Sequence, residues 1–239
     1  FQNEDAWAIP KETFLGDEEF FLLLLPLVYW SVDRALGVRL IVLLLLSNLV
    51  NQVAKTLADQ PRPYEYDARV EGIVEAAPLG FPSGHTQSAV VVWGYLAAQT
   101  RRRWLWVAAA VLMVMVPLSR VYLGVHFPTD LLGGYLIGVI VLVVWLRYSD
   151  RFERWFFSLP WVRQLLLVAA VPAAAMALWP TEEMVTGGAA MLGMGTGVAL
   201  ERRWVHFEAR GVAWRRIARF PLVCTADDPI AKLVTIDLE

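Results

Sequence analysis

Seven long apolar segments follow one another along this chain of 239 residues, and they restrict its fold more than any other feature. A helix that crosses a membrane needs about 20 mostly apolar residues. A soluble domain can bury one such segment in its core, but a chain of this length cannot bury seven. Hydrophobic residues make up 57% of the sequence, and the mean hydropathy of +0.49 exceeds that of ordinary soluble domains. We therefore predict an all-α, polytopic membrane bundle of about seven spans.

Short polar stretches separate the predicted spans. The spans cover residues 19–36, 38–54, 86–100, 104–118, 129–146, 161–180 and 184–200. The first and third are the least typical, because charged or polar residues lie within or beside them. These residues are Asp33, Arg34, Thr86 and Gln87.

The arginines lie in alternate connections, after the first, third, fifth and seventh spans. They are Arg34, Arg39, Arg101, Arg102, Arg103, Arg147, Arg151, Arg154, Arg163, Arg202 and Arg203. Cytoplasmic loops of membrane proteins carry an excess of Lys and Arg, so we assign these connections to the cytoplasmic side. The N-terminus and the loops 55–85, 119–128 and 181–183 then face outward. We expect a bacterial inner membrane, with the outward loops in the periplasm or at the cell exterior.

The pattern divides the chain into an N-terminal interfacial segment (1–18), a membrane domain (19–200) and an amphipathic helix with a tail (201–239). Aromatic residues recur at helical spacing after residue 200, which fits a helix on the inner leaflet or a soluble helix packed against the protein. No signal-peptide pattern is seen at the start. The single cysteine, Cys224, allows no disulfide within the chain. Residues 221–239 support no functional prediction.

Two pairs of glycines are spaced four residues apart, Gly134 with Gly138 and Gly193 with Gly197. This spacing is typical of close helix packing in membranes. We expect both pairs to pack within the chain rather than to form a dimer interface, and the sequence indicates no oligomeric state.

Three polar clusters interrupt the apolar pattern, and all lie on the predicted outward side. The first, at the end of the second span, carries Asn48, Asn51, Gln52, Lys55 and Arg62. The second is Pro82-Ser83-Gly84-His85, and the third contains Ser119, Arg120, His126 and Asp130. Polar groups in a membrane span are costly and usually face the bundle interior or a water-filled cavity. We therefore expect the clusters to converge on one site.

These clusters carry the groups that bind a phosphate. Lys55, Arg62 and Arg120 supply three positive charges and many hydrogen-bond donors. Ser83 adds a hydroxyl group. Gly84 allows a backbone N–H to approach an oxyanion at the N-terminus of the third span.

The third cluster also carries a candidate nucleophile. Asp130 follows His126 by four residues, so the two side chains are neighbours if they lie on one helix. A carboxylate bonded to one imidazole nitrogen fixes the tautomer and makes the other nitrogen more nucleophilic. Pro128 suits the first turn of a helix, which places His126 at the start of the fifth span. His85 is then available to protonate the leaving group.

The residue types and spacings of the three clusters resemble the three-part signature of the type 2 phosphatidic acid phosphatase superfamily. The membrane phosphatases of this superfamily are related to glucose-6-phosphatase and to the vanadium haloperoxidases. The motifs cover about residues 48–137, and the apolar pattern extends the resemblance to about residue 200. The resemblance implies a six-helix core and hydrolysis of a phosphomonoester or pyrophosphate through a phosphohistidine, with no metal or other cofactor. One departure is the outward N-terminus, since many bacterial lipid phosphatases begin inside.

By position, the resemblance implies that His126 is the nucleophile, Asp130 its orienting carboxylate and His85 the general acid. The phosphate-binding residues would be Lys55, Arg62, Ser83, Gly84, Ser119 and Arg120. Residues 64–80 would form a lid over the pocket.

Three other functions fit parts of the pattern. A haloperoxidase would use the same signature to bind vanadate, but those enzymes are soluble. A lipid phosphotransferase would pass the phosphoryl group to another acceptor, and a non-catalytic lipid transporter would keep the bundle without needing the two histidines. The expected partners are a lipid phosphate and the surrounding membrane lipids, because no nucleotide loop, nucleic-acid patch or metal site is visible. Phosphatidate, phosphatidylglycerol phosphate, a polyprenyl pyrophosphate and a sphingoid phosphate all remain candidates.

Overall fold

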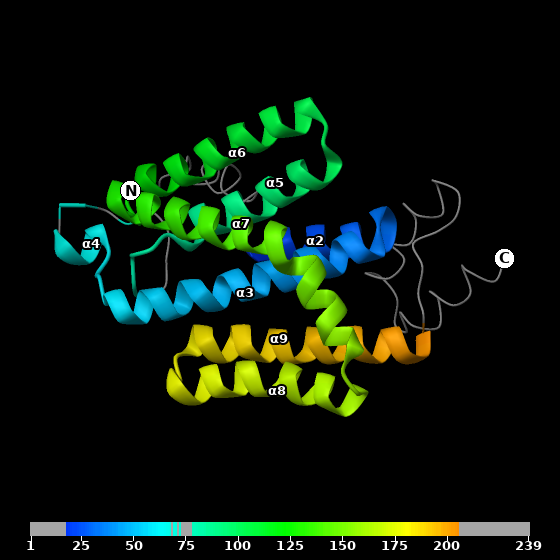
Figure 1. Ribbon diagram of the computed structural model, residues 1–239. Coiled ribbons are helices and arrows are strands. Elements are labelled where there is room, and N and C mark those ends of the chain that lie inside the picture. Colours follow the sequence, from blue (N-terminus) through cyan, green and yellow to red (C-terminus); the bar gives the residue numbers. More distant parts are fainter. Residues whose placement is uncertain (1–17, 68, 71, 73–77, 206–239) are drawn as a thin grey trace, which may run out of the picture.

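A computed structural model describes residues 18–67, 69, 70, 72 and 78–205, and helices make up its regular structure (Figure 1). The helices in chain order are α2 (Glu18–Leu27), the π-helical turn η3 (Val28–Val32), α3 (Arg34–Ala58), α4 (Pro63–Tyr66), α5 (Gly84–Thr100), α6 (Arg103–Tyr122), α7 (Pro128–Ser158), α8 (Trp161–Leu178), α9 (Glu182–Leu200) and the π-helical turn η4 (Glu201–Val205). The predicted all-α architecture is confirmed. The predicted interfacial segment, most of the C-terminal helix and its tail, and part of the proposed lid lie outside the described residues.

All seven predicted spans lie on helices, but their number and limits differ from the prediction. Within the described residues, four helices are long and apolar enough to cross a membrane by themselves: α3, α6, α7 and α8. The predicted first span, 19–36, is interrupted at Asp33, whose carboxylate accepts a hydrogen bond from Leu36 N at 2.7 Å and caps α3. The last residues of that predicted span therefore belong to α3.

The predicted fifth span, 129–146, lies within a longer helix. Helix α7 continues to Ser158, so Arg147, Arg151 and Arg154 lie on the helix and not in a loop. The reason is that Arg and Glu are good helix formers, so the helix continues beyond the end of the apolar segment. The next proline, Pro160, lies just beyond its end.

Helix α5 lies at the centre of the bundle. It packs against α3, α6 and α7, while the α8–α9 hairpin covers the other side of α3 (Figure 1). Its buried side chains, such as Val91 and Tyr95, form one apolar core with Leu40 and Leu43 of α3. The polar residues at its N-terminus are thereby held in the interior of the protein.

Glycines allow α5 and α7 to approach closely. A Cβ atom on Gly134 would lie 2.6 Å from the carbonyl oxygen of Ser83, and one on Gly138 would lie 3.1 Å from Val90 Cβ. The predicted packing role is therefore confirmed for this pair. It is wrong for Gly193 and Gly197 within the part of the chain that the structure describes, where no atom lies within 4 Å of such a Cβ.

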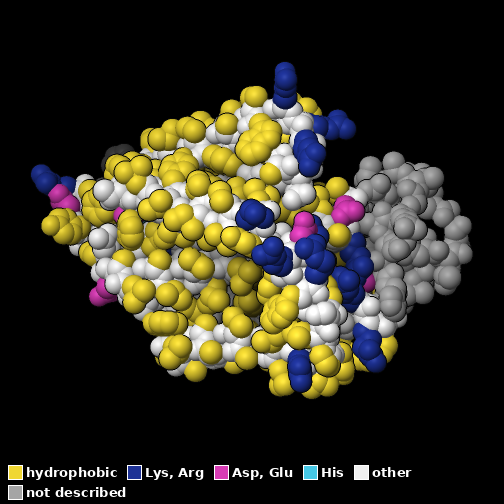
Figure 2. All heavy atoms as spheres, in the orientation of Figure 1, with side chains coloured by type: hydrophobic (Ala, Val, Ile, Leu, Met, Phe, Trp, Pro, Cys, Tyr) yellow, Lys and Arg dark blue, Asp and Glu magenta, His cyan; other side chains and the backbone are white. Residues whose placement is uncertain are grey.

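The surface divides into an apolar flank and a basic end. Hydrophobic side chains cover most of the visible face of the bundle (Figure 2), and residues such as Leu132 and Leu136 are 67% and 64% exposed. A soluble monomer rarely exposes apolar area on this scale, so the chain is an integral membrane protein. Most of the visible arginines gather at one end of the bundle (Figure 2), where Arg34 pairs with Glu201 at 2.5 Å and Arg39 with Glu153 at 2.6 Å. The end of α3, α4 and the start of α7 lie at the opposite end (Figure 1).

Candidate active site

Two segments of the loop between α3 and α5 are joined to each other by backbone contacts. Pro61 and Leu79 form an isolated antiparallel bridge, and Gly80 N donates a hydrogen bond to Gln60 O at 2.8 Å. Lys55, at the end of α3, donates from Nζ to Leu79 O at 2.9 Å. The first and second polar clusters are thus held side by side by backbone groups.

Arg62 links the first cluster to the third. Its side chain is buried, and Nη1 donates to Val125 O at 2.8 Å and lies 3.4 Å from Nε2 of His126. Its backbone N–H donates to the Glu65 carboxylate at 3.2 Å, which fixes Arg62 at the start of α4. Burial lowers the pKa of Arg62, but its ordinary value is so high that the group keeps its charge.

The second cluster forms the N-terminus of α5. Ser83 is the N-cap, with its hydroxyl 3.4 Å from Thr86 N. Its backbone N–H donates to Asp130 O at 3.0 Å, which joins this turn to α7. His85 lies in the first turn of α5 and is half-buried.

A buried amide network holds this turn against α3. Asn51 donates from Nδ2 to Gln87 Oε1 at 2.9 Å and to Pro82 O at 3.4 Å. Gln87 in turn donates to Ser47, to O at 2.7 Å and to Oγ at 2.8 Å. A Cβ on Gly84 would lie 3.2 Å from the Asn51 amide oxygen, so a larger residue would crowd this contact. The sequence indicated that Asn51 faces inward but did not identify Gln87 as its partner.

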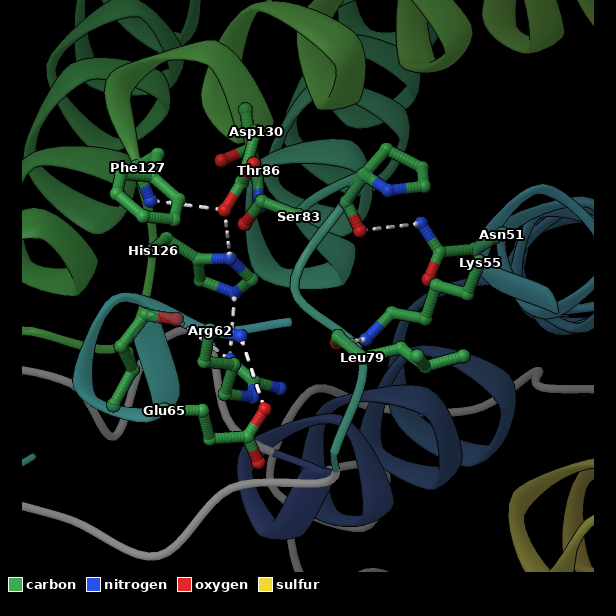
Figure 3. Close-up of polar contacts among 12 residues, drawn as sticks. Asn51, Lys55, Arg62, Glu65, Leu79, Ser83, Thr86, His126, Phe127 and Asp130 are labelled. Atoms are coloured by element: carbon green, nitrogen blue, oxygen red, sulfur yellow. Dashed lines mark hydrogen bonds and ion pairs between the residues drawn. The ribbon is translucent and has the colours of Figure 1, made fainter. Parts of the chain in front are cut away.

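The third cluster contains a histidine–carboxylate pair (Figure 3). Nδ1 of His126 lies 3.1 Å from Asp130 Oδ2, and the same oxygen accepts the Phe127 N–H at 2.9 Å. Both side chains are almost fully buried, at 3% and 1% exposure. Because an ionised carboxylate can only accept, Nδ1 is assigned the proton. Nε2 then carries the lone pair, and it points toward Arg62 (Figure 3).

The surroundings of His126 favour a neutral imidazole. Burial lowers the pKa of His126 to about 4, against the opposing effect of the hydrogen bond to Asp130, and the charge of Arg62 lowers this pKa further. At neutral pH Nε2 is therefore unprotonated, and its lone pair faces Nη1 of Arg62 at 3.4 Å.

The remaining predicted residues, Ser119 and Arg120, lie at the end of α6. Arg120 is buried in the last turn of α6, and its carbonyl accepts the Val125 N–H at 3.2 Å, which shapes the turn before His126. Ser119 is half-buried, and its hydroxyl donates to Val116 O at 2.7 Å within its own helix. Hydrogen bonds and close contacts thus connect Lys55 and Arg62 with the Ser83 turn and the His126–Asp130 pair, whereas the Ser119 hydroxyl bonds within its own helix.

The fold and the site together define a class of membrane protein in which a buried histidine–carboxylate pair faces basic side chains at one end of a helical bundle. Residues 36–154 match the model of the PAP2 superfamily. The chain belongs to this superfamily, as its three motifs predicted.

The similar proteins are named as phosphatases of different phosphorylated lipids. Sphingosine-1-phosphate phosphatase 2 of Mus musculus is 34% identical over 137 residues, which cover 54% of this chain and 38% of that protein. Undecaprenyl-diphosphatase of Sulfolobus acidocaldarius is 30% identical over 115 residues, covering 47% of this chain and 54% of the other. The chain therefore spans less than two thirds of either relative.

A solved structure has the same fold. It is a transmembrane PAP2-type phosphatidylglycerolphosphate phosphatase from Bacillus subtilis, with 25% sequence identity and a TM-score of 0.52. The match covers 63% of this chain and 79% of the other.

Proposed function

We propose that this protein is an integral-membrane phosphatase that hydrolyses a lipid phosphate or pyrophosphate through a phosphohistidine on His126, without a metal cofactor. The observation that carries the proposal is the buried His126–Asp130 pair, in which Asp130 contacts Nδ1 and the unprotonated Nε2 faces Arg62. The named relatives, which are phosphatases of lipid monophosphates and diphosphates, support the substrate class. The intact pair also argues against a non-catalytic transporter.

The proposed reaction has two steps. In the first, Nε2 of His126 attacks phosphorus, the bond from phosphorus to the leaving oxygen breaks, and His85 gives that oxygen its proton. Asp130 holds the Nδ1 proton and stabilises the charge that develops on the ring. In the second step a water attacks the phosphohistidine, His85 takes its proton, and phosphate leaves with His126 regenerated.

The basic residues stabilise the phosphoryl group during both steps. Arg62 lies against the proposed attacking nitrogen, and Lys55 and Arg120 are also buried. In the proposed complex their positive charges and donors bind the non-bridging oxygens, which carry the negative charge of the transition state. The backbone N–H groups at the start of α5, next to Gly84, add donors without a charge.

Release of free phosphate distinguishes a phosphatase from a lipid phosphotransferase, which would pass the phosphoryl group to a lipid acceptor instead of to water. We expect the purified protein in detergent to release inorganic phosphate from a lipid phosphate in the presence of a chelator, with inhibition by vanadate. A phosphotransferase would instead release little phosphate and label an added lipid acceptor. A loss of activity on chelation would contradict the metal-independent mechanism.

The pH dependence of kcat/KM tests the state of His126. Its pKa is lowered to about 4, so the neutral, nucleophilic form persists at pH 5 and is lost only as the pH falls through about 4. We expect the acidic limb of kcat/KM near pH 4 rather than near 6.5, after allowance for ionisation of the substrate phosphate at about pH 6. An acidic limb near 6.5 that persists with a substrate already ionised would contradict the proposed environment.

Labelling of single cysteines tests the orientation of the protein. We propose that the active site faces away from the cytoplasm of a bacterial inner membrane, because most of the arginines lie at the opposite end. In a Cys224→Ser background, Arg69→Cys, at a side chain 90% exposed, should react with an impermeant maleimide on intact spheroplasts. Gln99→Cys, exposed beside the arginines that precede α6, should react only after permeabilisation. The reverse pattern would place the active site inside.

A further inference from the structure

A glutamine is buried in the interior of the bundle, where an apolar residue would be less costly. Gln87 lies in the first turn of α5 and is 1% exposed, and its partners Asn51 and Ser47 on α3 are 3% and 1% exposed. Polar groups inside a membrane span are costly, and glutamine forms helices no better than leucine or methionine does. Gln87 has no chemical role in the proposed mechanism, so its burial requires another explanation.

Two backbone carbonyls determine the orientation of both buried amides. Nε2 of Gln87 donates to Ser47 O at 2.7 Å. Because a carbonyl can only accept, Oε1 of Gln87 faces the other way, where it accepts from Asn51 Nδ2 at 2.9 Å. The same Nδ2 lies 3.4 Å from Pro82 O, which is also only an acceptor. The hydrogen bonds that run from Ser47 through Gln87 and Asn51 to Pro82 therefore have one possible direction.

The network contacts the turn that carries His85. With Nδ2 of Asn51 directed at Gln87, the oxygen Oδ1 lies against the first residue of α5, where a Cβ on Gly84 would be 3.2 Å from it. The backbone N–H of Gln87 also donates to Ser83 O at 3.1 Å. Ser83 and Gly84 directly precede His85, so the network fixes the backbone from which the imidazole extends.

This turn is held between α7 and α3. On the side of α7, Ser83 N donates to Asp130 O at 3.0 Å. On the side of α3 it is held by Asn51, which lies one helical turn before Lys55 (Figure 3). Further along, α3 and α5 meet through apolar side chains, whose packing allows small displacements more readily than directional hydrogen bonds do. The amides therefore set the position of His85 relative to the rest of the site.

We propose that Gln87 is a positioning residue for the general acid. By orienting Asn51, it holds the Ser83–Gly84 turn so that His85 lies where it can protonate the leaving oxygen. Gln87 acts through Asn51, and the proposed mechanism gives it no contact with a reacting atom. The inference rests on the proposed phosphatase function and adds to it a residue outside the three motifs.

Replacement of Gln87 by methionine tests the proposal, because methionine has a similar length but makes none of these hydrogen bonds. A displaced His85 slows the release of an alkyl group, whereas an aryl group leaves without that proton. We expect Gln87→Met to lower the first-turnover rate of an alkyl lipid phosphate by about tenfold, and that of an aryl phosphate by less than about threefold. A loss of folded protein would lower both rates by the same factor, so their ratio separates positioning from stability.

Two control variants accompany this measurement. Gln164 donates from Nε2 to Leu159 O at 2.8 Å, so Gln164→Met makes the same chemical change and also removes a glutamine–carbonyl hydrogen bond, at the connection between α7 and α8. It should leave the alkyl-to-aryl ratio unchanged. Ser47→Ala removes a hydroxyl 2.8 Å from Gln87 Nε2 but keeps the carbonyl that orients the amide. It should lower the ratio much less than Gln87→Met does.

A double variant tests whether Gln87 acts through Asn51. We expect Asn51→Leu to cause the same selective loss on the alkyl substrate, and Gln87→Met added to it should cause no further loss in the ratio. Additive losses would show that Gln87 acts by another route and would overturn the proposed chain of contacts. Gln87→Asn keeps an amide that is too short to reach both Ser47 and Asn51. It should show the same selective loss, and it takes the place of Gln87→Met if that variant is not recovered folded.

Equal losses on both substrates in Gln87→Met would leave Gln87 a structural role alone and would overturn the proposal, as would an unchanged alkyl rate. If His85→Ala causes no selective loss while the wild-type protein hydrolyses both substrates, the phosphatase function stands and the positioning role fails with the general acid. If the wild-type protein releases phosphate from no lipid phosphate, the proposed function itself fails.

Discussion

Replacing His126 with alanine is expected to abolish phosphate release, with a loss of more than about 10³-fold in kcat. The proposed nucleophile is Nε2 of His126, which faces Arg62 while Asp130 holds the opposite nitrogen. The substitution also removes a buried ring, so some loss of stability will accompany it. Turnover should be measured on protein that elutes as a single species in detergent.

A second histidine variant provides the matched control. The chain has three histidines, and His206, for which no catalytic role is predicted, can be replaced by alanine with the same chemical change. We expect His206→Ala to keep wild-type turnover. If His126→Ala retained more than a few per cent of activity, another group would have to be the nucleophile. A phosphoryl group trapped on His126 by acid-free quenching and detected by mass spectrometry would support the assignment directly.

The chemistry of the site could be predicted from the sequence because its key contact is local. His126 and Asp130 are separated by one helical turn, and Pro128 at the start of α7 brings them together at 3.1 Å. The convergence of Arg62 on His126 depends on the fold, which the family resemblance supplied. The catalytic roles of these residues remain predictions.

The supporting contacts could not be predicted in the same way. Gln87 was visible only as a polar residue in an atypical span, and its partners Asn51 and Ser47 lie about 40 positions earlier on another helix. The spacing of polar residues along α5 does not indicate which residues of α3 they contact. The ends of helices were also missed, because α7 continues as an amphipathic helix after its hydropathy ends and Asp33 caps α3 where a span was expected to continue.

Replacing His85 with alanine is expected to lower kcat/KM for an alkyl lipid phosphate by about 10²–10⁴-fold, the usual contribution of a general acid. An aryl phosphate should lose much less, because its phenolate leaves without first taking a proton. The comparison is cleanest in the first turnover, followed as the burst of released phenol. Later turnovers also include hydrolysis of the phosphohistidine, in which His85 has a second role as a base.

The variant Asp130→Asn distinguishes a defect in nucleophilic attack from a defect in protonation of the leaving group. Asp130 contacts Nδ1 of His126, the proposed nucleophile, and the proposed mechanism gives it no part in protonating the leaving group. Its replacement should therefore slow the alkyl and aryl substrates by similar factors, whereas His85→Ala should slow mainly the alkyl substrate. Equal first-turnover losses on both substrates in His85→Ala would contradict the general-acid role and would point to a structural or phosphate-binding function for this half-buried histidine at the start of α5.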